Sequence, residues 1–124
     1  MIDIICIEDE EVFRRNLTEI LEAEGYKVKA FSDGAEALTY MQSPHEGLPK
    51  IVICDINLPQ VSGYEFVRRI KMLDSQAAGI PVIYLSAMGQ KQDIVKGMAL
   101  NVADYLIKPI DFDILTSKVK SLMG

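Results

Sequence analysis

Five short runs rich in Ile and Val recur along this chain of 124 residues, and longer segments with a helical spacing of apolar residues separate them. Parallel strands need a long crossover connection, which is usually a helix, so this alternation is typical of a parallel sheet with helices on both faces. We therefore predict a doubly wound α/β sandwich with five strands. The strands are expected at Ile4–Ile7, Lys27–Phe31, Ile51–Cys54, Val82–Leu85 and Tyr105–Ile107.

The apolar pattern within each run predicts where its strand lies in the sheet. Four of the runs are almost continuously apolar, which is typical of strands buried on both faces. The run Lys27–Phe31 alternates polar and apolar residues instead. It is therefore predicted to be an edge strand.

The helices are marked by apolar spacing and by capping residues. Gly25 is a plausible stop for the first helix, and Asp33 and Ser62 are each followed three residues later by Glu, as in a capping box. Gln42–Lys50 and Asp74–Ile80 are predicted to be surface connections. The five predicted helices contain or begin at Val12–Leu21, Asp33, Ser62, Gln90–Leu100 and Asp111.

The composition fits one compact domain and excludes several classes of protein. Hydrophobic residues make up 49% of the chain, and the formal net charge of −5 comes without a cluster of Lys or Arg. Direct binding of nucleic acid is therefore not expected. The chain has neither an apolar stretch of about 20 residues nor the features of a signal peptide at its start, so we expect no membrane span and a cytoplasmic location.

Polar side chains follow four of the five predicted strands at the point where each strand ends. In a doubly wound sheet, ligands bind outside the carboxyl ends of the strands. His45 lies in a connection away from this edge and is expected to have no catalytic role. The residues predicted to meet there are Glu8, Asp9 and Glu10 after the first strand, Asp55 after the third, Ser86 after the fourth and Lys108 after the fifth.

This set of side chains indicates phosphoryl transfer. Several carboxylates in one crevice repel one another unless a cation is present, and oxygen ligands with room for water suit Mg²⁺. Lys108 supplies a point charge for an anion beside the metal. A carboxylate can carry a phosphoryl group covalently, so we predict that Asp55 is the nucleophile.

The same segments resemble the receiver domain of bacterial response regulators, and the resemblance covers essentially the whole chain. The matching pieces are IICIEDE, IVICDINLPQVSGYEF, PVIYLSA and ADYLIKPID, in the order and at the separations of the family. The resemblance implies a flavodoxin-like (βα)5 fold with strand order 2-1-3-4-5. It also implies that residues 1–124 form a single receiver domain, which either works alone or was cut from a longer regulator.

For the metal, the resemblance implies that Asp9 and Asp55 bind Mg²⁺ directly, together with the backbone carbonyl of Asn57. Glu8 replaces the commoner Asp of the family and is expected to act through a water molecule. Asp55 is implied to be the phosphoacceptor, and Lys108 to pair with a phosphoryl oxygen.

Further residues carry implied roles in switching and in the lifetime of the phosphorylated state. Ser86 is similar to the hydroxyl that bonds the phosphoryl group, and Tyr105 to the aromatic residue that then turns inward. The small Ala87 leaves room for the phosphoryl group, and a cis peptide bond is expected before Pro109. Asn57 and Met88 lie at positions that tune hydrolysis, and Met88 cannot orient a water molecule, so we predict slow self-dephosphorylation.

The implied partner is a histidine kinase or a histidine phosphotransfer protein. The family uses the surface of the fourth helix, fifth strand and fifth helix for homodimers, downstream proteins or an output domain. Two other functions stay open, a degenerate receiver that only docks proteins and an aspartate-nucleophile phosphohydrolase. Against the latter, Asn57 stands where such hydrolases place a second Asp. A nucleotide-binding domain is disfavoured because neither glycine-rich phosphate motif is present.

Overall fold

The structure is a computed structural model that describes residues 1–44, 46–87 and 103–124. Its five strands form one parallel sheet in the order β2-β1-β3-β4-β5, as predicted. His45, Met88 and the predicted helix Gln90–Leu100 lie outside the described residues. The strands are β1 (Ile4–Ile7), β2 (Val28–Phe31), β3 (Ile51–Asp55), β4 (Val82–Ser86) and β5 (Asp104–Ile107).

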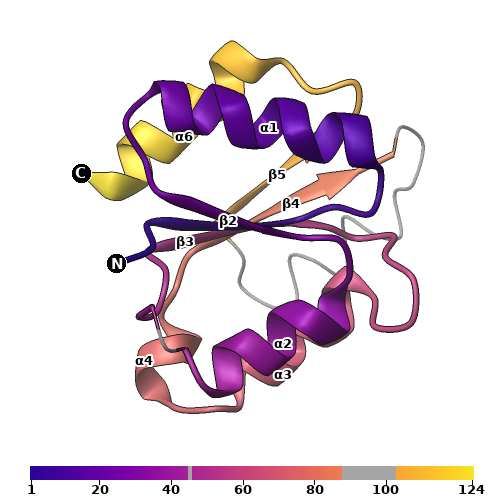
Figure 1. Ribbon diagram of the computed structural model, residues 1–124, viewed down its shortest axis with the longest axis vertical. Helices are drawn as coiled ribbons and strands as arrows, with labels where there is room; N and C mark the ends of the chain where they lie inside the picture. Colours follow the sequence, from indigo (N-terminus) through magenta and orange to yellow (C-terminus); the bar gives the residue numbers. More distant parts are fainter. Residues whose placement is uncertain (45, 88–102) are drawn as a thin grey trace.

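Helices cover both faces of the sheet (Figure 1). Figure 1 shows α1 (Glu11–Ala23) and α6 (Phe112–Met123) on one face, and α2 (Gly34–Gln42), α3 (Gly63–Lys71) and α4 (Ser75–Ala78) on the other. In the described part of the chain, no helix is long and apolar enough to cross a membrane.

Each face of the sheet has its own apolar core, because successive side chains of a strand point to opposite faces. Ile4 and Cys6 of β1 pack in the core under α1 and α6, whereas Ile5 and Ile7 pack in the core under α2 and α3. The helix residues of the first core are Leu17, Leu21, Leu115 and Val119. Cys6 and Cys54 are fully buried free thiols that belong to different cores. The central strands β1, β3 and β4 are buried along their whole length, which fits their continuous apolar runs.

The predicted helix starts are found where the capping residues indicated them. The side chain of Asp33 accepts a hydrogen bond from the Glu36 N–H at 2.8 Å, and that of Ser62 accepts one from the Glu65 N–H at 3.2 Å. Asp111 caps α6 in the same way. Gly25, after α1, has a φ of +96°, a conformation that glycine adopts at little cost.

One prediction is wrong. The run Tyr105–Ile107 was expected to be buried on both faces, but β5, at the edge that the predicted strand order gives it, is only partly buried, and Ile107 is 43% exposed. The segment Asp74–Ile80 connects α3 to β4, as predicted, and it contains the one-turn helix α4, which was not predicted. Asp74 caps that turn through the Ala77 N–H at 2.7 Å, and burial of Ala77 and Ile80 holds the turn against the fold.

Candidate phosphoryl-transfer site

The carboxyl ends of β1, β3 and β5 bring three charged side chains into direct contact. The Nζ atom of Lys108 donates to Oδ2 of Asp55 at 2.6 Å and to Oε1 of Glu8 at 2.7 Å. Glu8 is fully buried, Asp55 is 4% exposed, and the Lys108 side chain is 27% exposed. The predicted cluster therefore exists, and in this structure Lys108 is the cation that offsets the two buried carboxylates.

Backbone N–H groups fix the other oxygen of each buried carboxylate. Oε2 of Glu8 accepts from the Glu10 N–H at 3.1 Å, and Oδ1 of Asp55 accepts from the Asn57 N–H at 2.8 Å. Both oxygens of Glu8 thus have a donor.

Burial, the largest influence, raises the pKa of the Glu8 carboxyl to about 7, although the hydrogen bonds from Lys108 and from the Glu10 backbone oppose this shift. The nearby charge of Asp55 raises it further. For Lys108, burial alone would lower the pKa, but the hydrogen bonds to Asp55 and Glu8 outweigh it and raise the pKa. The two shifts describe a carboxyl that is costly to ionise beside an amine that stays charged.

Glu8, Asp9 and Asp55 also form an oxygen-donor set that fits a divalent cation. One carboxylate oxygen from each lies within 4.8 Å of the others, and Asp9 is exposed at the mouth of the site. Hard oxygen ligands with open positions for water suit Mg²⁺. These residues therefore fit the metal that the sequence analysis predicted.

Glycine shapes the loop that follows Asp55. A side chain at Gly63 would place its Cβ 2.4 Å from the Asp55 carbonyl oxygen and 2.8 Å from Cα of Ile56. The Gly63 N–H instead donates to the Ile56 carbonyl at 2.9 Å, which folds the loop back on the end of β3. The close approach to the backbone of Asp55 thus requires glycine here.

The remaining predicted residues lie around this centre. Ser86 is fully buried at the end of β4, where its hydroxyl donates to the Ala87 carbonyl at 3.2 Å. The Ser86 carbonyl accepts from the Lys108 N–H at 2.7 Å, so β4 and β5 end side by side. The peptide bond between Lys108 and Pro109 is cis.

Tyr105 lies near the start of β5, before the strand end that leads into Lys108. It is half-buried, packs against the core on the α2 and α3 face, and pairs in register with Tyr84 of β4. The structure therefore does not bring Tyr105 to Asp55. It places this side chain on the sheet edge next to β4.

Two residues of α1 contact the site although the sequence analysis gave them no role there. Nη1 of Arg14 donates to the Glu8 carbonyl at 2.9 Å and to the Asp9 carbonyl at 3.4 Å. The ring of Phe13 lies under Nζ of Lys108, 4.8 Å from its centroid. Their position in the first turns of the helix after the acidic loop is the sequence signal that could have identified them.

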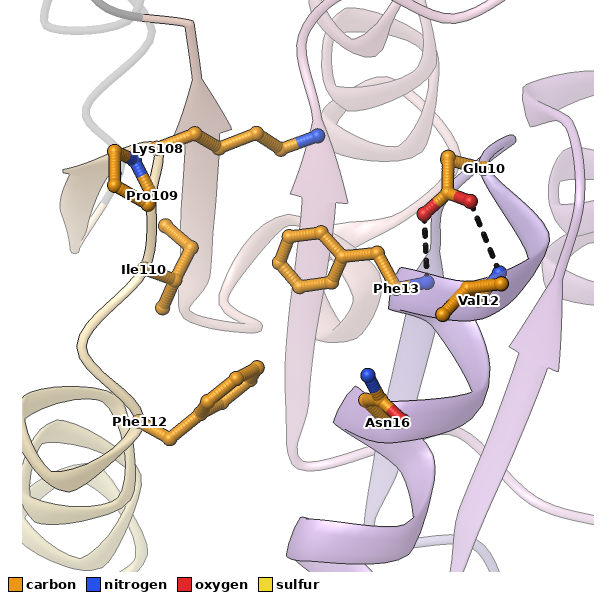
Figure 2. Close-up of a pocket in the computed structure, with 8 residues that line it drawn as sticks. All are labelled: Glu10, Val12, Phe13, Asn16, Lys108, Pro109, Ile110 and Phe112. Atoms are coloured by element: carbon orange, nitrogen blue, oxygen red, sulfur yellow. Dashed lines mark hydrogen bonds between the residues drawn. The ribbon is translucent and has the colours of Figure 1, made fainter.

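A groove of about 370 Å³ opens beside Lys108 on the α1 and α6 face (Figure 2). Figure 2 shows Phe13 and Val12 approaching it from α1, and Ile110 and Phe112 from the segment that leads into α6. The charged centre thus borders a largely apolar surface.

Comparisons with known proteins agree with this geometry. The model of the response regulator receiver domain family matches residues 4–120. The phosphate regulon regulatory protein PhoB of Rhizobium meliloti is 37% identical over 97% of this chain and 51% of its own length. The two-component response regulator PhoP of Pseudomonas aeruginosa is 32% identical over the same shares. The chain thus spans about half the length of these curated relatives.

Solved structures give the same result. The chemotaxis protein CheY4 of Vibrio cholerae matches with a TM-score of 0.86 and 26% identity over 98% of each chain. The receiver domain of a signal transduction histidine kinase from Syntrophus aciditrophicus matches with a TM-score of 0.86 and 29% identity, over 98% of this chain and 89% of that one. This chain belongs to the response regulator receiver domain family of two-component systems.

Proposed function

We propose that Asp55 accepts a phosphoryl group from a phosphohistidine of a histidine kinase or phosphotransfer protein in a reaction that needs Mg²⁺. The observation that carries the proposal is the position of Asp55, a buried carboxylate within 2.6 Å of the Lys108 ammonium and next to the Glu8 and Asp9 carboxylates. Such an arrangement suits phosphoryl transfer, where catalysis is mainly positioning and neutralisation of charge.

The transfer forms one bond to phosphorus and breaks another, and side chains of this protein offset the charge. A carboxylate oxygen of Asp55 forms the new bond to phosphorus as the bond between phosphorus and the donor's imidazole nitrogen breaks. That nitrogen keeps the electron pair, and because the other ring nitrogen of the phosphohistidine carries a proton, the ring is released as neutral imidazole. Lys108 neutralises a phosphoryl oxygen, and bound Mg²⁺ would neutralise others, held by Asp9, Asp55 and the Asn57 carbonyl, with Glu8 acting through water.

Phosphorylation would then switch the surface of the segment 90–100, β5 and α6. The Ser86 hydroxyl lies buried at the end of β4, and Tyr105 lies on the neighbouring edge strand, so a shift of Ser86 toward a phosphoryl oxygen would change the space beside Tyr105. The switched surface would serve a second copy, a downstream protein or an output domain. Loss of the phosphoryl group is expected to be slow, because Met88 cannot orient a water molecule.

The test is incubation with Mg²⁺ and acetyl phosphate, followed by mass spectrometry of the intact protein. The parent chain should gain one phosphoryl group, and Asp55→Asn should gain none. Asp113→Asn is the matched control, because Asp113 is an exposed carboxylate in the first turn of α6. It should react like the parent.

Beryllium fluoride with Mg²⁺, followed by NMR, tests the switch without a covalent step. Shift changes at both Asp55 and Tyr105 are expected. A folded parent chain that neither reacts nor shows these changes would instead be a degenerate receiver that only docks proteins. Repeated hydrolysis of phosphate esters would indicate a phosphohydrolase.

A further inference from the structure

The ammonium group of Lys108 has three N–H donors, and the structure gives two of them to carboxylates. Its third side faces the ring of Phe13, with Nζ 4.8 Å from the ring centroid. Figure 2 shows the Lys108 side chain extending over this ring from β5, while Phe13 approaches from α1. Lys108 therefore has an aromatic partner in addition to its two anionic ones.

We propose that Phe13 is a positioning residue that keeps the Lys108 ammonium beside Asp55 when a divalent cation takes over the carboxylates. The proposal rests on the proposed function and deepens it. A metal ion bound by Asp9 and Asp55 would weaken the ion pair between Asp55 and Lys108, because it neutralises the charge of the Asp55 carboxylate. The ring of Phe13 carries no charge and binds no metal, so its attraction for the ammonium remains.

The ring is anchored through the backbone of α1, which a positioning role requires. The Phe13 N–H donates to the Glu10 side chain at 2.7 Å, which anchors its backbone in the first turn of α1. Its ring meets the ring of Phe112 edge to face, with centroids 5.9 Å apart and planes at 84°. The first turn of α1 thus anchors the aromatic face under Lys108, and Phe112 packs against it.

Partial burial strengthens this contact. An ammonium over an aromatic face is attracted to the negative face of the ring, and the attraction grows when water competes less for the cation. The Lys108 side chain is 27% exposed, whereas an unpaired lysine at a strand end would reach into solvent. The Phe13 ring and the apolar walls of the groove limit the exposure of the Lys108 side chain to solvent.

Phe112 supplies a matched control. Phe13 and Phe112 are both half-buried, line the same groove and pack against the same core. Of these two described rings, only that of Phe13 lies within cation–π distance of the Lys108 ammonium. Replacing either by Leu removes one ring from the groove, but only Phe13→Leu removes the ring under the cation.

NMR of the Lys108 side chain tests the proposal directly, in the metal-free protein and with Mg²⁺. The ring current of Phe13 should shift the Lys108 Hε protons upfield, and this shift should persist at saturating Mg²⁺. Phe13→Leu should abolish it, whereas Phe112→Leu and Phe13→Tyr should keep it. Loss of the shift in the parent when Mg²⁺ binds would overturn the proposal.

The rate of phosphorylation gives a second readout. With acetyl phosphate at saturating Mg²⁺, Phe13→Leu should react about three- to tenfold more slowly than the parent. Its Mg²⁺ affinity should be unchanged, and Phe112→Leu and Phe13→Tyr should react like the parent. Equal rates for Phe13→Leu and the parent would refute the proposal. A parent that does not react at all would refute the proposed function instead, while the NMR signature still decides the role of Phe13.

Discussion

The two ends of the sheet differ in how far their charged side chains are buried. At the carboxyl end, Glu8, Asp55 and Lys108 form ion pairs at 2.6 and 2.7 Å in which both carboxylates are almost completely buried. At the amino end, Lys50 and Asp3 pair at 3.7 Å, and their side chains are 60% and 22% exposed. The carboxylates are thus buried at the carboxyl end, whereas the amino-end pair is longer and its cation lies in solvent.

This difference separates charges that support function from charges that keep the surface polar. An exposed ion pair contributes about 0–1 kcal/mol, because water solvates both partners when the pair opens. A buried pair gives little net stability, but the loss of one partner is costly because it leaves an uncompensated charge. The carboxyl end therefore holds a set of buried charges in which the loss or addition of one charge should have a large effect.

The largest expected effect comes from removing the cation at the carboxyl end. Lys108→Met should destabilise the metal-free protein by about 4 kcal/mol, because it leaves the buried carboxylates of Glu8 and Asp55 unpaired. Mg²⁺ should recover much of this loss and should stabilise the variant more than the parent. Urea unfolding with and without Mg²⁺ measures both effects.

Lys50→Met is the matched control at the amino end. Lys50 is 60% exposed and its ion pair is long at 3.7 Å, so the free energy of unfolding should change by no more than about 0.5 kcal/mol, with or without Mg²⁺. Equal losses for the two variants would remove the distinction between the two ends of the sheet.

Glycine substitutions extend the comparison to the backbone. Gly63→Ala should destabilise the protein by about 3 kcal/mol, because the new Cβ meets the Asp55 carbonyl oxygen at 2.4 Å and the backbone has to move. It should also slow phosphorylation, since Asp55 itself is displaced. Gly79 precedes β4 at the amino end, and a Cβ there would meet its nearest neighbour at 3.6 Å. Gly79→Ala should therefore leave both stability and phosphorylation within error of the parent or slightly raise stability.

The strand pattern predicts part of the site but not all of it. Parallel strands end at one edge of a sheet, so the meeting of Glu8, Asp55 and Lys108 could be predicted from the strand pattern alone. The direct contact of Lys108 with both carboxylates could not, because strand order does not fix the direction of a long side chain. Phe13 and Arg14 were missed for a related reason, since in sequence they resemble ordinary residues of an amphipathic helix.

The fold shows a similar limit. Capping residues and apolar periods predicted the main helices because both signals are local. The burial of β5 was predicted wrongly, because a short apolar run does not reveal how far the helices cover an edge strand. At the edge, Ile107 is left 43% exposed. The helix α4 was missed because one turn is too short to show a period.

The buried carboxyl of Glu8 should make the stability of the protein depend on pH. In the folded protein the pKa of Glu8 is about 7, compared with an ordinary value of 4.5, so the folded state holds a proton that the unfolded chain has released. The contribution of Glu8 to the free energy of unfolding is therefore greatest below pH 4.5 and falls as the pH rises from 4.5 through about 7. Between pH 5 and 7 the metal-free parent should lose about 2 kcal/mol relative to Glu8→Gln.

Urea unfolding of the parent and of Glu8→Gln across this range, without Mg²⁺, measures the difference. Mg²⁺ prefers the ionised carboxylate, so the affinity of the parent for Mg²⁺ should weaken as the pH falls below 7. If the stabilities of the two proteins run parallel from pH 5 to pH 7, burial does not raise the pKa of Glu8 as described.

The smallest expected effect comes from two adjacent arginines in α1. Arg14 bonds the carbonyls of Glu8 and Asp9, which precede the helix and lie outside its hydrogen-bond ladder, whereas Arg15 pairs with Glu11 on the exposed face. Arg14→Ala frees the acidic loop without removing a carboxylate, so Mg²⁺ affinity should fall about fivefold, or about 1 kcal/mol. Arg14→Lys should recover part of this loss, and Arg15→Ala should bind Mg²⁺ like the parent. Calorimetric titration distinguishes the two arginines. If both alanine variants bind Mg²⁺ equally well, the carboxylates alone fix the metal site, and the buried charges at this end of the sheet need no support from α1.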